Sequence, residues 1–162
     1  MTDFNGTDDD DTLSGTTGAD TINGEGGSDT IVGDDGADII NAGEGNDTVS
    51  GGKGTDTINL GVGDDTWIVK DDEVVLNAAY GSWGASSIFD TVDGGDGTDK
   101  IWIQNSSGIN IDLSKSTISG FEALQIGPPS GNNYNRKIRL DEDQINQLDS
   151  IEARYGYYSG GT

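Results

Sequence analysis

The spacing of aspartates is the feature of this sequence that most constrains its fold. Over residues 6–68 an aspartate recurs every nine residues for seven units. Two residues after each aspartate stands an apolar residue, and two residues before it stands a glycine in every unit except the first, which has Asp9. The aspartates are Asp11, Asp20, Asp29, Asp38, Asp47, Asp56 and Asp65, and the apolar residues are Leu13, Ile22, Ile31, Ile40, Val49, Ile58 and Trp67. Three columns that keep register over seven units indicate a repeat protein.

Each unit predicts a turn followed by a short strand. The glycine-rich half allows left-handed or tight backbone. The other half, such as "DTI" or "DTV", is short and β-branched, which suits a strand. A strand of this length is not stable alone, so stacked neighbours must share one narrow core that the apolar column fills. Two consecutive units then make one coil of a solenoid with two strand faces and two edges of turns.

Alternate aspartates are expected to stack on opposite edges of this solenoid. Asp11, Asp29, Asp47 and Asp65 fall on one edge, and Asp20, Asp38 and Asp56 fall on the other. Neighbouring parallel coils lie about 4.8 Å apart, so these carboxylates repel one another strongly. A dication between each pair converts the repulsion into attraction. Carboxylate and carbonyl oxygens are the ligands that Ca²⁺ prefers, whereas Mg²⁺ demands a tighter geometry.

Composition supports a cation-dependent fold and excludes several classes of partner. The chain has 30 acidic and 8 basic residues, a formal net charge of -22, and only 31% hydrophobic residues. Such a composition is typical of disorder unless cations cancel the charge. Nucleic acids and anionic membranes are disfavoured as partners, because both require basic surfaces. The absence of cysteine and histidine excludes disulfides, thiolate sites and most zinc sites.

Two segments carry a resemblance to a known family. "GGKGTDTIN" (51–59) and "GGDGTDKIW" (94–102) resemble the RTX, or haemolysin-type, nonapeptide G-G-x-G-x-D-x-U-x. The resemblance covers residues 6–68 and about 85–102, roughly half of the chain. It implies an all-β fold, a right-handed parallel β-roll with calcium between successive turns on each edge, and about five or more calcium ions.

The resemblance also implies which residues hold the metal. In such rolls one turn gives its second and fourth carbonyls and its aspartate, and the turn two units on gives its first and third carbonyls and its aspartate. On one edge the implied sets are Thr7, Asp9 and Asp11 with Gly24, Gly26 and Asp29; Glu25, Gly27 and Asp29 with Ala42, Glu44 and Asp47; and Gly43, Gly45 and Asp47 with Leu60, Val62 and Asp65. On the other edge they are Thr16, Gly18 and Asp20 with Gly33, Asp35 and Asp38, and Asp34, Gly36 and Asp38 with Gly51, Lys53 and Asp56.

The period breaks after Ile68. The next consensus turn starts at Gly94, which does not lie a whole number of nine-residue units after Leu60, and this predicts an insertion loop at about 69–84. Asp90 and Asp99 are expected to be further ligands, with Asp71 or Asp72 as the partner one coil away. Tyr80 and Trp83 in the insertion could stack on sugars or plug the end of the roll.

Charge and pattern change again near residue 103. Residues 1–102 hold 23 acidic and 3 basic residues, whereas residues 103–162 hold 7 and 5. We therefore predict a β-roll over 1–102 and a C-terminal capping region over 103–162. Within it, 101–126 should form strands that extend the roll, 137–140 a strand, and 141–154 one short amphipathic helix with Ile145, Leu148 and Ile151 on one face.

These observations favour a non-enzymatic calcium-binding module. The resemblance implies a secreted or cell-surface bacterial protein, exported by a type I system and folded by extracellular calcium, with a structural or adhesive role. The N-terminus has neither a basic nor an apolar region, so no cleaved signal peptide is expected there, and no membrane insertion is expected. The alternative is a calcium-dependent carbohydrate-binding or accessory module of a secreted polysaccharide-acting enzyme, with glycans or cell-surface ligands as partners.

Overall fold

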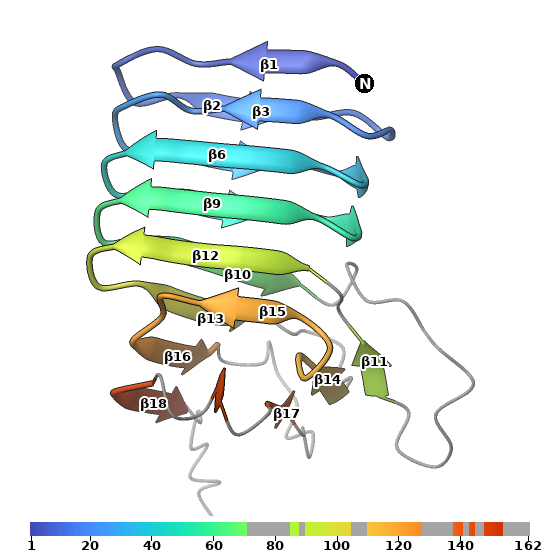
Figure 1. Ribbon diagram of the computed structural model, residues 1–162, viewed down its shortest axis with the longest axis vertical. Helices are drawn as coiled ribbons and strands as arrows, with labels where there is room; N and C mark the ends of the chain where they lie inside the picture. The colour runs from blue at the N-terminus through green and yellow to red at the C-terminus, as the bar shows by residue number, and fades with distance from the viewer. Residues whose placement is uncertain are drawn as a thin grey trace, which may run out of the picture.

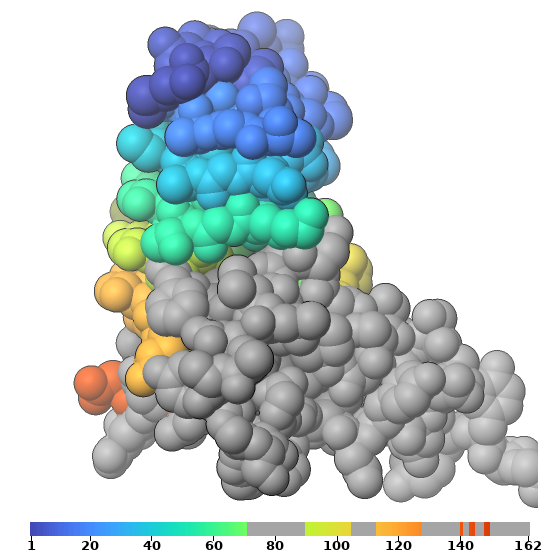
Figure 2. Space-filling view, turned by 90° about the vertical axis from the view of Figure 1, so that its right-hand side faces the viewer, coloured from blue at the N-terminus to red at the C-terminus, as the bar shows by residue number. Residues whose placement is uncertain are grey.

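The computed structural model describes residues 1–70, 85–87, 90–104, 110–127, 138–140, 143–144 and 148–153. They form a stack of coils in which the strands of neighbouring coils pair in parallel. Each coil gives one strand to a six-stranded sheet and one to a seven-stranded sheet, which lie in front and behind in Figure 1. Figure 2 shows the N-terminal coils, blue to green, as level bands of colour stacked along the long axis. The chain is a parallel β-roll, as the nine-residue period predicts.

The two large sheets hold most of the strands. The six-stranded sheet contains, in spatial order, β1 (Asp3–Asn5), β3 (Thr21–Asn23), β6 (Ile39–Glu44), β9 (Thr57–Val62), β12 (Thr91–Asp96) and β15 (Thr117–Ser119). The seven-stranded sheet contains β2 (Thr12–Ser14), β4 (Thr30–Val32), β7 (Thr48–Ser50), β10 (Thr66–Lys70), β13 (Lys100–Gln104), β16 (Ala123–Ile126) and β18 (Ser150–Ala153).

Two small sheets complete the described strands. β5 (Asp35–Gly36) pairs with β8 (Lys53–Gly54) within the turns of one edge. A three-stranded sheet contains β11 (Ala85–Ser87), β14 (Asn110–Asp112) and β17 (Ile138–Arg139). The short strand β17 falls within the strand predicted at 137–140.

The pairing register shows how the break after Ile68 is accommodated. Up to β9 and β10, each residue pairs with the residue two nine-residue units away, as Ile22 does with Ile40. Ile58 instead pairs with Val92, and Trp67 with Ile101, both at a longer separation in sequence. The extra residues lie between Lys70 and Asp90. The predicted insertion loop at 69–84 starts too early, because Val69 and Lys70 belong to β10 and pair with Ile103 and Gln104, and residues 71–84 lie outside the described part of the chain. The coil resumes in register after it, so the stack is continuous.

The core is one cluster of apolar side chains between the two large sheets. Six of the seven predicted column residues, from Ile22 to Trp67, are at most 1% exposed, and Leu13 packs against them half-buried. Ala42, Leu60, Val69 and Ile103 add a second buried column. Val92 and Ile101 continue the core beyond Leu60 and Trp67. The strands predicted at 101–126 extend the roll as β13, β15 and β16, with β14 in the three-stranded sheet.

The predicted helix at 141–154 is wrong over its second half. Asp143 and Gln144 are helical, but Ser150–Ala153 is strand β18, in which Ile151 pairs with Leu124 of β16. The exposed edge of β16 offers a full set of hydrogen-bond partners, and this tertiary pairing outweighs the local helical pattern. No helix among the described residues is long and apolar enough to span a membrane. The boundary at residue 103 stays a prediction, although both large sheets continue past it.

Candidate metal centres along the edges of the roll

The predicted aspartates form one file along each edge, and backbone hydrogen bonds tie each file together. The N–H group of each aspartate donates to a carboxylate oxygen of the next coil. On the first edge Asp11 donates to Asp29 at 2.8 Å, Asp29 to Asp47 at 2.8 Å, Asp47 to Asp65 at 2.7 Å and Asp65 to Asp99 at 2.9 Å. On the second edge Asp20 donates to Asp38 at 2.8 Å, Asp38 to Asp56 at 2.9 Å and Asp56 to Asp90 at 2.9 Å. The alternation of edges is thus present as predicted.

These bonds correct the expected partners of Asp90 and Asp99. The structure stacks Asp90 on Asp56 and Asp99 on Asp65, rather than either residue on Asp71 or Asp72. Asp71 and Asp72 lie outside the described residues. The coil that follows the insertion therefore stacks directly on the coil that precedes it.

The second oxygen of most of these carboxylates has no hydrogen-bond partner within the described part of the chain. Oδ1 accepts the N–H bond, where one is formed, while Oδ2 is buried and unpartnered in Asp29, Asp38, Asp47, Asp56, Asp65 and Asp99. A buried carboxylate oxygen without a donor or a cation is costly. Oxygens of one kind in two regular files therefore indicate positions where a cation is expected.

The first residue of each turn shows where these oxygens converge. A Cβ atom added to Gly33 would lie 2.7 Å from Asp38 Oδ2 and would collide with the carbonyl oxygen of Gly51, one coil on. A Cβ added to Gly24 would collide with Asp29 Oδ2 and the carbonyl oxygen of Ala42. A carboxylate of one turn and a first-position carbonyl of the next coil thus share one small space, as the predicted ligand sets require.

The first two turns satisfy their carboxylates internally. The backbone N–H and the hydroxyl of Thr7 both donate to Asp11 Oδ2, at 2.7 and 2.9 Å. Thr16 does the same to Asp20 Oδ2, at 2.7 Å for both bonds. Asp11 and Asp20 therefore stand in the two predicted files, but their Oδ2 atoms already have two donors each. In the sequence, a threonine at the second position of both turns marks this difference. The nonapeptide pattern gives that position a role only through its main-chain carbonyl, as a metal ligand, so it does not predict the bond from the hydroxyl.

Electrostatics distinguishes Asp20 from several buried aspartates of the later coils. The hydrogen bond from the Thr16 hydroxyl holds the pKa of Asp20 below its ordinary value. Burial raises the pKa of Asp38, Asp47 and Asp99, and raises the pKa of Asp56 and Asp65 to about 6 and that of Asp90 to about 7. Loss of water is the main cause at each of these positions, and the carboxylate of a neighbouring coil adds to it. A cation would reverse both effects.

The second position of the later turns needs a left-handed backbone. Gly43 has a φ of 118°, and an added Cβ would collide with the carbonyl of Glu25 one coil earlier. Glu25 and Asp34 occupy the same position with φ of 74° and 72°, although neither is glycine. Their carbonyls accept the N–H groups of Glu44 and Lys53 at 2.9 and 2.8 Å. Thr7 and Thr16 do not have a positive φ, which is why their N–H groups can turn toward the carboxylate.

A second ladder supports the first edge. Ser28 N–H donates to Asp10 Oδ1 at 2.7 Å, Asp64 N–H to Asn46 Oδ1 at 2.9 Å, and Thr98 N–H to Asp64 Oδ1 at 3.0 Å. These fifth-position bonds point to the preceding coil, whereas the aspartate bonds point to the following one. The repeat pattern does not predict this ladder, because the fifth position has no single residue type.

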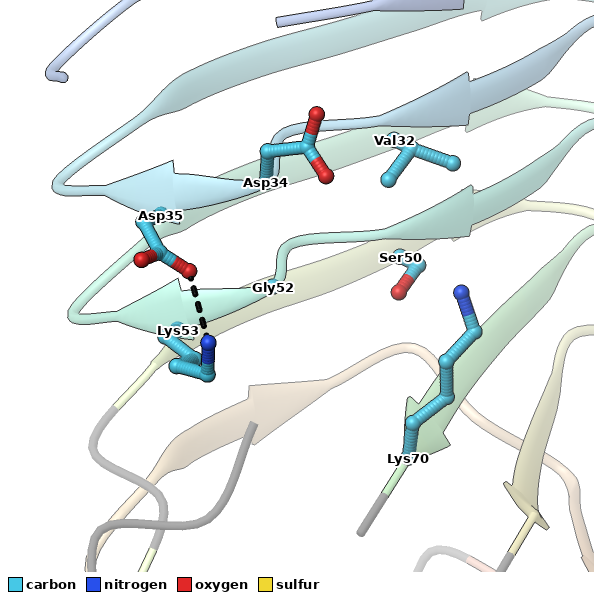
Figure 3. A pocket seen from close by; sticks show the side chains of 7 residues that line it. All are labelled: Val32, Asp34, Asp35, Ser50, Gly52, Lys53 and Lys70. Atoms are coloured by element: carbon cyan, nitrogen blue, oxygen red, sulfur yellow. Dashed lines mark hydrogen bonds and ion pairs between the residues drawn. The ribbon is translucent and has the colours of Figure 1, made fainter. Parts of the chain in front are cut away.

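On the second edge, two predicted main-chain ligands also form an ion pair through their side chains. Lys53 Nζ lies 3.0 Å from Asp35 Oδ1, and both side chains are about half exposed at 56% and 52%. Figure 3 shows this pair beside a shallow pocket whose other labelled residues are Val32, Asp34, Ser50, Gly52 and Lys70. The ion pair is formed by the two side chains and is exposed to solvent, so it does not engage the main-chain carbonyl of either residue.

The donor set fits calcium. Among the described residues no group of three His, Cys, Asp or Glu side chains is arranged to hold a metal ion by itself, so a site between coils would also need main-chain carbonyls. Two carboxylates from adjacent coils with carbonyl oxygens around them form an oxygen-only donor set, which suits the roughly six to eight ligands of Ca²⁺. A calcium ion there would neutralise the buried charge and link neighbouring coils.

Comparison with known proteins agrees with this geometry. A family model described as the RTX calcium-binding nonapeptide repeat, in four copies, matches residues 5–40, 32–66 and 89–102. No curated protein and no solved structure matches the chain. RTX nonapeptide repeats bind Ca²⁺, and several copies imply several calcium ions. The repeat part of this chain, residues 5–66 and 89–102, therefore belongs to the RTX family of calcium-binding nonapeptide repeats.

Proposed function

We propose that this chain is a structural module of a secreted or cell-surface protein and that extracellular calcium folds it. The observation that carries the proposal is the set of buried aspartate oxygens without hydrogen-bond partners, arranged in two files along the described coils. RTX repeats are typical of extracellular proteins exported by type I secretion, which supports this location.

We assign one calcium ion to each of five gaps between coils. On the first edge these gaps lie between Asp29 and Asp47, Asp47 and Asp65, and Asp65 and Asp99; on the second edge they lie between Asp38 and Asp56, and Asp56 and Asp90. Three of them are among the predicted sites, with the main-chain ligands given above. The two remaining predicted gaps, after Asp11 and after Asp20, have threonine donors on Oδ2, so we leave them without an ion.

Energetics makes folding conditional on the metal. An unsatisfied buried polar atom costs about 1–3 kcal/mol, and more when it is charged. Five such atoms approach the total stability of a typical domain, about 5–15 kcal/mol. Extracellular calcium modules bind at about 0.1–1 mM, so an extracellular level of calcium fills the sites and a cytosolic level leaves them empty. The chain would then stay unfolded before export and fold after it.

Circular dichroism and tryptophan fluorescence test this proposal. Trp67 is fully buried, with its ring centroid 6.2 Å from that of Phe121, so its emission reports on the core. Strand signal and a blue-shifted emission should require calcium at roughly 5–10 mM, above the expected dissociation constants. The same magnesium concentration should not replace it. A full strand signal in EGTA would contradict the proposal.

The adhesive role and the absence of catalysis belong to the same proposal. For the alternative, a carbohydrate-binding or accessory module of a polysaccharide-acting enzyme, the candidate sugar-binding residues lie outside the described part of the chain; they are Tyr80, Trp83 and the tyrosines near the C-terminus, Tyr155, Tyr157 and Tyr158. A glycan array probed with and without calcium separates the two. Calcium-dependent glycan binding that Trp83→Ala abolishes would favour the alternative, and no binding would favour a purely structural module.

A further inference from the structure

The first edge continues one step beyond the last repeat. Asp99 is the final aspartate of the file, is 0% exposed, and has an Oδ2 atom without a hydrogen-bond partner among the described residues. Three other carboxylates, those of Glu122, Asp64 and Asp93, lie near enough to perturb it electrostatically. The repeat match ends at residue 102, so nothing in the nonapeptide pattern supplies a partner for this oxygen.

A shortened turn lies opposite Asp99 on the next coil. Asp93 pairs with Ser119 and Lys100 with Ala123, so the turn of residues 94–99 faces only the segment 120–122. Glu122 Oε2 accepts the backbone N–H of Asp99 at 2.8 Å, as the aspartate Oδ1 of the next coil does elsewhere in the file. The turn is too short to place an aspartate opposite Asp99, and the longer side chain of Glu122 reaches the same position instead.

The same converging oxygens recur at this end. A Cβ added to Gly94 would lie 2.6 Å from Asp99 Oδ2 and would collide with the carbonyl oxygen of Gly120. This matches the arrangement beside Gly33, where Asp38 Oδ2 and the Gly51 carbonyl converge. Gly120 has a φ of 73°, so it occupies a left-handed conformation that favours glycine.

The second edge ends differently. Thr117 pairs with Thr91, which places Ser116 opposite Asp90. The side-chain amide of the buried Gln144 donates to the carbonyls of Leu113 and Ser116, both at 3.0 Å. An amide therefore closes that edge, whereas an unpartnered carboxylate oxygen and a second carboxylate stand at the end of the first edge in the described structure.

We propose that Asp99, Glu122 and the carbonyl of Gly120 form a further calcium site, outside the nonapeptide repeats, that joins the roll to the strands after it. Glu122 takes the role of the missing aspartate. This site rests on the proposed function, since it needs the same ion at the same edge. It fixes β15 and β16 to the last repeat, so it makes the C-terminal strands dependent on calcium as well.

Counting bound calcium in the whole chain tests this site. Equilibrium dialysis or calorimetry should give one ion fewer for Glu122→Gln than for the unchanged chain, because the amide keeps an acceptor for Asp99 N–H but loses the charge. Asp3→Asn is the matched control: it removes one charge from an exposed position of β1 at the other end of the roll and should leave the count unchanged. An unaltered count in Glu122→Gln, with calcium binding otherwise normal, would overturn this site alone.

Two further results keep the test decisive. Glu122→Asp retains the charge on a shorter side chain, so we expect the full count with one site weakened about tenfold or more. Wild-type affinity at every site in Glu122→Asp would also overturn the inference, even if Glu122→Gln failed to fold. If the unchanged chain bound no calcium at all, the proposed function itself would fail.

Discussion

The backbone N–H of Asp47 donates to Oδ1 of Asp65 at 2.7 Å, while Asp47 itself receives the N–H of Asp29 at 2.8 Å. Asp47 therefore borders two of the gaps to which we assign calcium. Asp47→Asn should keep both hydrogen bonds, because the amide oxygen can still accept, but it removes the charge from both gaps. We expect two ions to bind at least about tenfold more weakly. Calorimetry with site counting measures this, with Asp3→Asn as the charge control; the loss of only one ion would refute the sharing of Asp47.

The threonine-bonded turns should behave differently from the rest of the file. Asp20→Asn should leave the number of bound calcium ions unchanged, because Oδ2 of Asp20 already accepts two bonds from Thr16. Thr16→Val should also leave the count unchanged, and should lower the free energy of unfolding in saturating calcium by about 1–2 kcal/mol through the lost hydroxyl bond. Urea titration and calcium counting on the same samples check both statements. Loss of one ion in Asp20→Asn would contradict this prediction and would indicate a calcium ion between Asp20 and Asp38.

Glu25 and Asp34 hold left-handed backbone without being glycine, so replacing them should stabilise the roll. A non-glycine residue in this conformation costs about 1–2 kcal/mol. Glycine avoids that cost but loses about 0.5–1 kcal/mol more conformational entropy on folding. We expect Glu25→Gly and Asp34→Gly each to raise the free energy of unfolding by about 0.5–1 kcal/mol, measured in saturating calcium. Glu25→Gln controls for the lost charge, and Ser28→Gly, at a position without positive φ, should be destabilising. Equal effects of Glu25→Gln and Glu25→Gly would remove the backbone explanation.

Acidification should favour the folded chain when calcium is absent. Burial raises the pKa of Asp56 and Asp65 to about 6 and that of Asp90 to about 7 from an ordinary 3.8. These groups bind protons more tightly when folded, so their stabilising contribution is present at low pH and is lost as the pH rises through about 6 to 7. Calcium-stripped protein at pH 5, above the isoelectric point of about 4.1, should therefore show more strand signal than at pH 7.5. Equal strand signal at the two pH values would contradict this expectation.

The calcium-bound protein should show the opposite dependence. Protons and calcium compete for the same oxygens, so the apparent calcium affinity should fall as the pH drops below about 6 to 7. Calcium titrations at pH 7.5 and 5 measure it. A calcium affinity that stays constant over this pH range would show that the carboxyl groups with raised pKa values are not the ligands.

Much of the fold could be predicted from the sequence because the nine-residue period determines how the coils can stack. A nine-residue repeat with one apolar residue per unit leaves few ways to bury that residue, so the column from Ile22 to Trp67, the parallel coils and the alternation of edges could all be predicted. The stacking of Asp29 on Asp47 followed from the same period. These features depend only on local turn chemistry and on the repetition of one strand.

The rest depended on contacts that the period does not describe. The Thr16 hydroxyl donates to the Asp20 oxygen that a metal would otherwise bind. The repeat pattern gives only the residue types at each position, so it does not reveal this competition. The stacking of Asp90 on Asp56 could not be placed, because an insertion does not indicate at which residue the coil resumes. Ile151 fitted a helix by its spacing, but the open edge of β16 supplied backbone partners that the local sequence does not contain.

The coils of this roll differ in length without any loss of register. Ile58 pairs with Ile40 on one side and with Val92 on the other, and both pairings belong to the same sheet although the second spans the insertion. Strand pairing in this stack therefore does not require a fixed number of residues per coil: β9 and β12 pair in parallel although the chain between them is longer than in the earlier coils. We therefore expect that a foreign peptide of comparable length can replace residues 71–84 without loss of the pairing between β9 and β12, which makes this point of the chain a place for insertions into a scaffold whose folding we propose to depend on calcium.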